Sequence, residues 1–172
     1  AEWRRENGYV VNVVERDDTG SSTTNIKNFI EDAYYNWENP PEYVCLVGDT
    51  SGSHDVNTFS VGTGWVNAES DFPYVLQEGD DFLPDLFIGR LSVRSNTELG
   101  VVINKIIGYE KNYNIDTNWI TTAALVGDPY SASGISTVIT NEYIEQIMNI
   151  HGGITDVRTK FSGSDFDGWM RN

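Results

Sequence analysis

The amino-acid sequence predicts an α/β fold with a mostly parallel sheet, and three observations support this prediction. Short apolar runs with the length of buried strands occur at residues 43–49, 86–91 and 121–128. Segments with apolar residues at helical spacing lie before, between and after these runs. Polar, glycine-containing stretches separate the two kinds of segment. Strands that alternate with helices favour a parallel sheet covered by helices.

The first elements along the chain form a β-α-β unit. Residues 9–14, a β-branched run, predict a strand, and residues 24–37 predict an amphipathic helix capped by Thr23 or Thr24. The continuous apolar run at 43–49 predicts a strand that is covered on both faces. Because a crossover helix joins them, the two strands are expected to be parallel.

The middle of the chain predicts a long loop followed by a strand and a helix. Residues 50–70 are rich in Gly, Ser, Asn and Thr, and a loop of that length inside a domain is usually functional or mobile. Residues 72–76 predict a short hairpin arm, and residues 86–91 a buried strand. Ser95 and Glu98 match a capping box, which predicts that a helix begins there.

The last part of the chain predicts another strand-helix-strand unit. An apolar strand at 121–128 ends in Gly-Asp, a helix follows at about 136–150, and a strand at 155–161. Apolar periodicity pauses at 112–118, and this pause indicates a weak boundary between two parts of the chain.

Composition excludes several classes of partner. The 172 residues include 26 acidic and 11 basic side chains, and the formal net charge is −15. Nucleic acids and anionic membranes bind through Lys and Arg, so neither is expected as a partner.

One cysteine, Cys45, allows no internal disulfide. No stretch reaches the roughly 20 apolar residues of a membrane span. The opening AEWRRENG has no signal peptide, which suggests a processed, excised or engineered start.

Four carboxylates lie close together before the strand at 86–91: Glu78, Asp80, Asp81 and Asp85. Like charges at this spacing repel unless water or a cation lies between them. Oxygen donors suit calcium, which takes about six to eight of them, and the loop has no His or Cys to favour zinc. The alternative is a solvated acidic loop, which is what most charge runs are.

Other polar residues are weaker candidates for a site. Asp49 and Asp128 each follow an apolar strand, and ligands of parallel sheets bind beyond such strand ends. Arg90 ends an apolar strand and is expected to pair with a carboxylate. Asp49 as a receiver-type phosphoacceptor is a further possibility, but the paired acids and the lysine of a receiver are not evident.

The cysteine and the two histidines are expected to have ordinary structural roles. Cys45 lies in the middle of an apolar run and is expected to be a buried core thiol rather than a nucleophile. His54 is expected to be an exposed loop residue. His151 is expected near the negative end of the preceding helix.

Three segments, taken together and in order, resemble a known family. They are YVCLVGD at 43–49, SDFPY at 70–74 and GDDFLPDLFIGRLSVRSNTELGVVINKIIGYEKN at 79–112. The run resembles the gingipain-type cysteine peptidases, family C25 of clan CD. The likeness implies a caspase-like three-layer sandwich, incomplete at both ends here. Residues 1–117 would be its first subdomain and residues 118–172 the beginning of its second.

The resemblance also implies an activity. The parent protein would be a secreted or cell-surface, calcium-stabilised cysteine endopeptidase, with proteins or peptides as substrates and the remainder of its own catalytic domain as a partner. The family's Gly-His-Gly step and nucleophilic cysteine do not occur here, so this piece alone is expected to be inactive. Asp128 falls near the position of the acid that orients the catalytic histidine.

A calcium site follows from the same resemblance. Its implied side-chain ligands are Asp49, Asp81 and Asp85, and its implied carbonyl ligands are Glu78 and Leu83. The ion would be structural, since it would tie the loop to two strand ends and neutralise the charge cluster. The alternative function is a non-enzymatic calcium-binding scaffold or adhesion module with a peptidase-like fold.

Overall fold

The computed structural model describes residues 1–63, 66–111, 117–127, 136–161 and 168–169. The chain forms two compact units, residues 1–111 and residues 112–172, each of which is described by itself. The subdomain boundary predicted after residue 117 stays a prediction. Elements of the first unit are α1 (Glu2–Glu6), α2 (Arg16–Thr19), α3 (Thr23–Asn36), β1 (Tyr43–Val47), β2 (Phe59–Thr63), β3 (Val66–Ser70), the 3-10 helix η1 (Phe72–Val75), β4 (Phe87–Leu91) and α4 (Asn96–Lys111). Those of the second are η2 (Asn118–Thr121), β5 (Thr122–Val126), α5 (Thr137–His151) and β6 (Asp156–Lys160).

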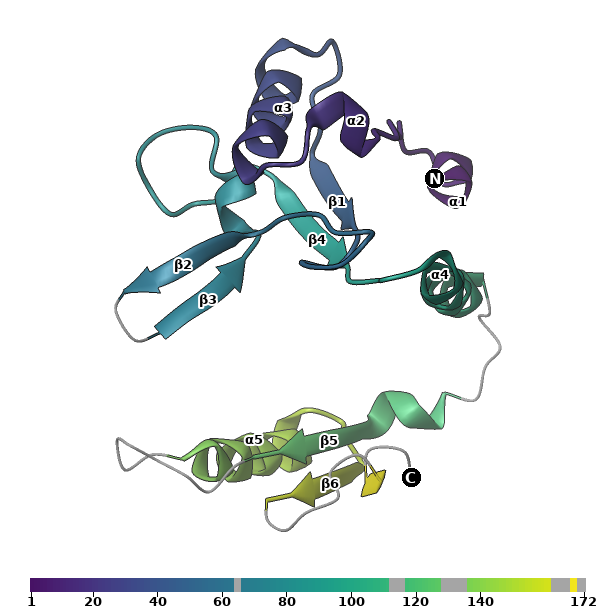
Figure 1. Ribbon diagram of the computed structural model, residues 1–172. Coiled ribbons are helices and arrows are strands. Elements are labelled where there is room, and N and C mark those ends of the chain that lie inside the picture. The colour runs from purple at the N-terminus through teal and green to yellow at the C-terminus, as the bar shows by residue number, and fades with distance from the viewer. Residues whose placement is uncertain (64–65, 112–116, 128–135, 162–167, 170–172) are drawn as a thin grey trace. The chain divides into compact units, whose positions relative to one another are not determined.

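Strands β1 and β4 form a parallel pair in the first unit (Figure 1). Their register places Tyr43 beside Phe87 and Val47 beside Leu91. Both strands lie where the apolar runs predict them. Parallel strands need a crossover connection, and here residues 48–86 supply it with the β2–β3 hairpin and η1.

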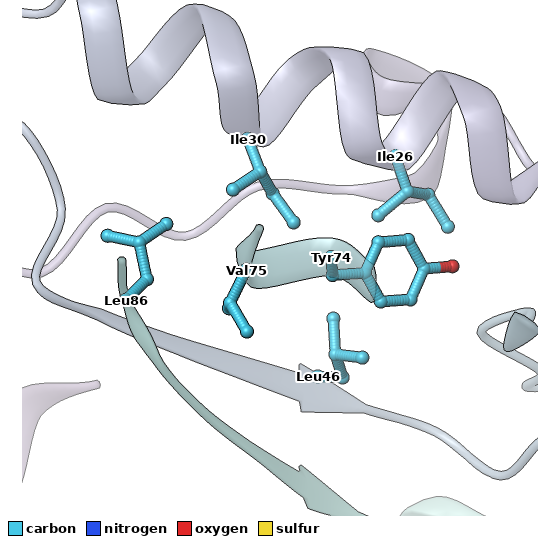
Figure 2. Packing of buried hydrophobic residues seen from close by; sticks show 6 residues of the cluster. All are labelled: Ile26, Ile30, Leu46, Tyr74, Val75 and Leu86. Atoms are coloured by element: carbon cyan, nitrogen blue, oxygen red, sulfur yellow. The ribbon is translucent and has the colours of Figure 1, made fainter. Parts of the chain in front are cut away.

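A small hydrophobic core lies between α3, η1 and the inner face of β1 (Figure 2). Its buried side chains are Ile26, Ile30, Leu46, Tyr74, Val75 and Leu86. Each fully buried side chain of this kind contributes about 1.5–3 kcal/mol of transfer free energy. The helical spacing that predicts α3 is confirmed, because its buried residues belong to the predicted apolar face.

The cap of α3 differs from the prediction by one position. Ser22 precedes the helix with extended backbone angles, and its hydroxyl accepts the amide N–H of Asn25 at 3.1 Å. Thr23 and Thr24 lie inside the helix. Ser22 satisfies one of the amides that an α-helix leaves unpaired at its start.

The outer face of the β1–β4 pair differs from the expectation that both faces are covered. Tyr43, Cys45, Val47 and Phe87 are exposed in the part of the chain that the structure describes. The rings of Tyr43 and Phe87 stack across the strands, with 5.2 Å between their centroids. Cys45 is therefore an exposed strand residue, and its prediction as a buried core thiol is wrong.

The segment predicted as a long loop contains an antiparallel hairpin. Strands β2 and β3 pair from Phe59 beside Ser70 to Gly62 beside Asn67. The polar residues of these strands led to the prediction of a loop. A tertiary contact supports the base of the hairpin, because the ring of Phe59 meets the ring of Tyr74 edge-on at 4.8 Å.

Residues 72–75 form the 3-10 helix η1 instead of a hairpin arm. Pro73 stands in its first turn, where a proline's fixed φ and missing N–H are tolerated. The amide of Tyr74 donates to the carbonyl of Asp71 at 3.0 Å. This turn points Tyr74 and Val75 into the core, where both are fully buried.

The strand predicted at residues 9–14 is not formed, since the structure assigns this segment no strand or bridge. Val10 and Val13 are exposed there, and Tyr9 meets the ring of Tyr43 edge-on at 6.2 Å. The preference of β-branched residues for strands depends on packing against a neighbouring strand, which this segment lacks here.

Helix α4 begins much as the capping box predicts. Ser95 Oγ accepts the amide of Glu98 at 3.2 Å. The carboxylate of Glu98 reaches back one residue further than the motif requires and accepts the amide of Arg94 at 2.6 Å. Glu110 in the last turn of α4 pairs with Arg4 of α1 at 2.7 Å, so the two helices are joined.

The second unit is a strand-helix-strand unit, as predicted. Strands β5 and β6 are parallel, with Thr122 beside Asp156 and Val126 beside Lys160, and α5 connects them. Ser136 caps α5 by accepting the amide of Ile139 at 3.4 Å. The parallel β1–β4 and β5–β6 pairs confirm the predicted α/β class with mostly parallel strands.

Candidate functional site

The carboxyl ends of β1 and β4 are where a parallel pair of strands holds its ligand. Beyond the strands the two chains stay side by side, because the amide of Gly48 donates to Leu91 O at 3.0 Å and that of Asp49 to Val93 O at 3.1 Å. Gly48 has φ +147, and a Cβ there would lie 2.3 Å from the carbonyl oxygen of His54. Only glycine lets the following loop pass this closely.

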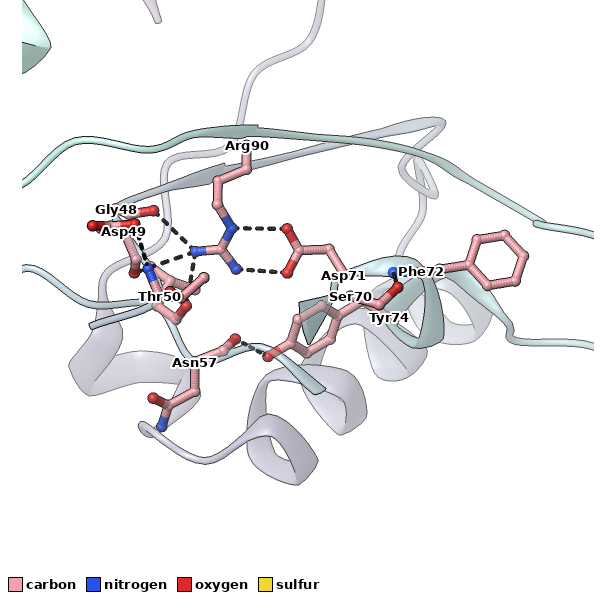
Figure 3. A network of polar contacts seen from close by, with 10 residues as sticks. Gly48, Asp49, Thr50, Asn57, Ser70, Asp71, Phe72, Tyr74 and Arg90 are labelled. Atoms are coloured by element: carbon pink, nitrogen blue, oxygen red, sulfur yellow. Dashed lines mark hydrogen bonds and ion pairs between the residues drawn. The ribbon is translucent and has the colours of Figure 1, made fainter. Parts of the chain in front are cut away.

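Arg90 of β4 connects three segments at this strand end (Figure 3). Its Nε and Nη2 each donate to an oxygen of Asp71 at 2.7 Å. Its Nη1 donates to the carbonyls of Gly48 at 2.9 Å and Val56 at 2.8 Å. Arg90 therefore fixes both the loop after β1 and the end of the hairpin, and the prediction that it pairs with a carboxylate is confirmed.

The surroundings shift the pKa of Asp71, a member of this pair, and of the neighbouring Tyr74. Hydrogen bonds from Arg90 lower the pKa of the Asp71 carboxyl, although partial burial acts in the opposite direction. Burial raises the pKa of Tyr74 to about 12, so its hydroxyl stays protonated and donates to the carbonyl of Asn57 (Figure 3). These contacts anchor the loop after β1 to the core.

Asp49, predicted as a metal ligand, lies in the same region and is bound by protein donors. Its Oδ1 accepts the amide of Thr50 at 2.9 Å, and its Oδ2 forms a short ion pair with Arg94 Nε. The hydrogen bond from Arg94, followed by that from Thr50, lowers the pKa of Asp49. Sequence reasoning did not identify Arg94, because only the β1–β4 register brings it next to Asp49.

The acidic loop binds its own backbone. Asp85 Oδ2 accepts the amides of Glu78 at 2.9 Å and Gln77 at 2.6 Å, and these bonds lower the pKa of Asp85. Asp81 Oδ1 accepts the amide of Leu83 at 2.8 Å. Glu78, Asp81, Leu83 and Asp85 thus belong to one folded loop.

Asp49 is not brought together with this loop. Asp49 donates its amide to the carbonyl of Val93, which lies beyond the end of β4. Asp85 lies before the start of β4, where the amide of Phe87 donates to the carbonyl of Glu42 at 2.9 Å. The length of β4, Phe87–Leu91, lies between these two points of the chain. A shared ion at the five predicted ligands stays a prediction, and in this arrangement Asp49 is bound by Thr50 and Arg94.

The described residues do not present a ready-made calcium site. Among them, no three Asp, Glu, His or Cys side chains are grouped as a metal ion requires. In the acidic loop, one carboxylate oxygen of Asp81 and one of Asp85 accept hydrogen bonds from backbone amides. Calcium binding by the loop stays a prediction, and it needs the loop to exchange some of these internal bonds for bonds to the ion.

Within the first unit, Cys45 and His54 are not hydrogen-bonded to each other. His54 is hydrogen-bonded to Ser53 Oγ at 2.9 Å, and His151 ends α5 in the second unit. Partial burial raises the pKa of the Cys45 thiol, with Arg4 acting in the opposite direction. Asp128, the predicted orienting acid, lies outside the described residues.

Comparison with known proteins identifies the relatives of this chain. The model of peptidase family C25 matches residues 1–166. Gingipain R2 of Porphyromonas gingivalis is 27% identical over 157 residues, which are 88% of this chain and 20% of the relative. Lys-gingipain of the same organism is 30% identical over 165 residues, 90% of this chain and 9% of the relative. The chain thus spans a fifth or less of the length of these curated relatives.

Solved structures agree with this assignment. The crystal structure of the Arg-specific cysteine proteinase gingipain R superposes with a TM-score of 0.79 at 24% identity, over 98% of this chain and 39% of that chain. A complex of Porphyromonas gingivalis RgpB pro- and mature domains gives a TM-score of 0.76 at 25% identity, over 95% and 38%. The predicted gingipain-like α/β fold is confirmed, and the chain belongs to peptidase family C25, the gingipain-type cysteine peptidases.

Proposed function

We propose that this chain is part of the catalytic domain of a cysteine endopeptidase that hydrolyses peptide bonds in proteins. The match of the family model to residues 1–166 is the observation that supports this proposal most strongly. In such an enzyme a thiolate attacks the peptide carbonyl, and a histidine moves the proton to the leaving amine. Cys45 and His54 of the first unit form no such pair, so the proposal assigns that step to residues outside this unit.

Within this proposal the first unit has a supporting role. Arg90 and Asp71 hold the loop after β1 and the hairpin at the strand end, with Arg90 bonded to carbonyls on both sides of the loop. Strand ends of parallel sheets face the ligand, so a loop fixed there contributes a rigid wall next to a substrate.

The expected partners follow from the family. We propose protein substrates and the remainder of the same catalytic domain as partners, and secretion or display at the cell surface as the location. A solved relative is a complex of pro- and mature domains, which makes a pro-segment a further candidate partner. Among the described residues, no helix has the length and apolarity needed to cross a membrane.

Proteolysis by the full-length gene product tests the proposal. A casein substrate is expected to be cleaved, and a thiol-alkylating reagent is expected to abolish the cleavage. A Cys45→Ser variant of the same protein is the matched control, and it should remain active, since Cys45 is not the proposed nucleophile. The 172-residue chain alone should be inactive. A full-length protein that folds but cleaves no protein substrate would favour the scaffold alternative.

The scaffold alternative is a non-enzymatic module with a peptidase-like fold. It shares the acidic loop with the enzyme proposal, so calcium binding does not separate the two. Labelling of full-length protein with a peptidyl electrophile for cysteine peptidases does separate them, because a scaffold is expected to remain unlabelled.

A further inference from the structure

We propose that the guanidinium of Arg94, rather than a bound metal ion, balances the carboxylate of Asp49 in this chain. Any calcium that the chain binds is then held without Asp49. The inference concerns the fold of this chain and does not rest on the proposed peptidase activity.

Both carboxylate oxygens of Asp49 already accept hydrogen bonds from protein donors. Thr50 donates its amide to Oδ1 at 2.9 Å, and Arg94 bonds Oδ2 through Nε. The Asp49 side chain is only 16% exposed, so few directions of approach remain open to water or a hydrated ion. A metal ion at this carboxylate would have to displace at least the arginine.

The pairing follows from the register of the strands. Asp49 donates its amide to Val93 O at 3.1 Å, which places the next residue, Arg94, beside it. Glu98 then holds the backbone of Arg94 by accepting its amide at 2.6 Å. The cation reaches Asp49 from an adjacent strand end, so no distant loop is needed to complete the contact.

A second positive group makes a metal ion at this position unfavourable. Arg90 Nη1 donates to the backbone carbonyls of Gly48 at 2.9 Å and Asp49 at 3.4 Å. A divalent ion at Asp49 would therefore be close to two guanidinium groups, and like charges at such distances repel. The acidic loop that was expected to share the ion lies at the opposite end of β4.

Arg94 thus has the structural role at Asp49 that was expected for the calcium ion. It ties the end of β1 to the start of α4 and neutralises a carboxylate that is mostly covered. Because the Arg94 side chain is 72% exposed, the contact is open to water and is weakened by salt.

A double-mutant cycle tests the pair. Asp49→Asn, Arg94→Gln and the double variant are unfolded with urea, once with a chelator and once with excess Ca²⁺. The expected result is coupling between the two residues of about twofold to fivefold in the unfolding equilibrium constant. The coupling should be the same in both solutions and smaller at high salt. Arg94→Lys, which keeps the charge, should recover part of it.

Two outcomes would overturn the inference. One is additive single variants, which means that Asp49 and Arg94 do not interact. The other is coupling that disappears in excess Ca²⁺ together with weaker Ca²⁺ binding by Asp49→Asn in calorimetry, which means that the ion displaces the arginine. Asp81→Asn is the matched control, since it removes a carboxylate from the acidic loop and leaves the pair intact.

Discussion

Arg90 and Asp71 form an ion pair with two parallel hydrogen bonds, each 2.7 Å long, between residues 19 positions apart in the sequence. The Arg90 side chain is 9% exposed and that of Asp71 is 20% exposed. Removal of one partner from such a covered pair leaves a charge without compensation. The pair therefore matters more for stability than a surface ion pair of the same length.

Arg90→Met is expected to lower the free energy of unfolding by about 2–4 kcal/mol, because Asp71 then stays partly covered without its cation and three segments lose their common donor. Urea unfolding at neutral pH measures the loss. Arg16→Gln is the matched control: Arg16 pairs with Asp55 at the same 2.7 Å, but its side chain is 48% exposed. The control should lose about 0–1 kcal/mol. Equal losses in the two variants would contradict the special role of Arg90.

Asp85 is expected to make the protein sensitive to acid. The amides of Glu78 and Gln77 hold its pKa below the ordinary value in the folded state. A carboxyl with a lowered folded pKa stabilises the fold above its unfolded pKa, about 3.9, and this contribution is lost as the pH falls through the folded pKa. Asp85→Asn should therefore be less stable at neutral pH and should lose less further stability on acidification.

Urea unfolding at a series of pH values from neutral to about 2 tests this expectation. Asp80→Asn removes an acid from the same loop and serves as the control. Its acid profile should remain close to that of the wild type. A profile of Asp85→Asn that parallels the wild type would show that the amide bonds to Asp85 are not formed in solution.

The sequence predicted those parts of the fold in which local pattern and burial agree. The run at 43–49 predicts β1, and helical spacing predicts the face of α3 that carries Ile26 and Ile30. The hairpin was missed because its strands carry polar residues and depend on the contact of Phe59 with Tyr74. The strand at 9–14 was predicted from composition, although composition does not supply a neighbouring strand.

The candidate site was predictable to a smaller extent. A buried arginine needs a carboxylate, so the pairing of Arg90 could be expected, but its partner Asp71 could not be chosen from many acids. Asp49 was assigned to one site with the acidic loop through the resemblance to the gingipain-type peptidases. Only the parallel register separates them and places Arg94 next to Asp49.

Calcium binding is expected, if it occurs, to depend on the acidic loop. Asp81→Asn should weaken binding at least tenfold in calorimetric titration, because it removes a charged ligand oxygen from a site that needs about six to eight. Asp49→Asn should leave the affinity unchanged. Equal affinities of wild type and Asp81→Asn would remove the loop as a calcium site.

Cys45 is expected to react slowly with alkylating reagents despite its exposure. Only the thiolate is nucleophilic, and partial burial raises the pKa of this thiol, so little thiolate is present at neutral pH. Labelling with iodoacetamide, followed by mass spectrometry, should be slower than that of glutathione and should accelerate as the pH rises. Arg4 lowers the pKa of Cys45, so Arg4→Gln should slow the reaction further. Faster labelling than glutathione at neutral pH would contradict this account and would make Cys45 a candidate nucleophile after all, since a reactive thiol needs a lowered pKa.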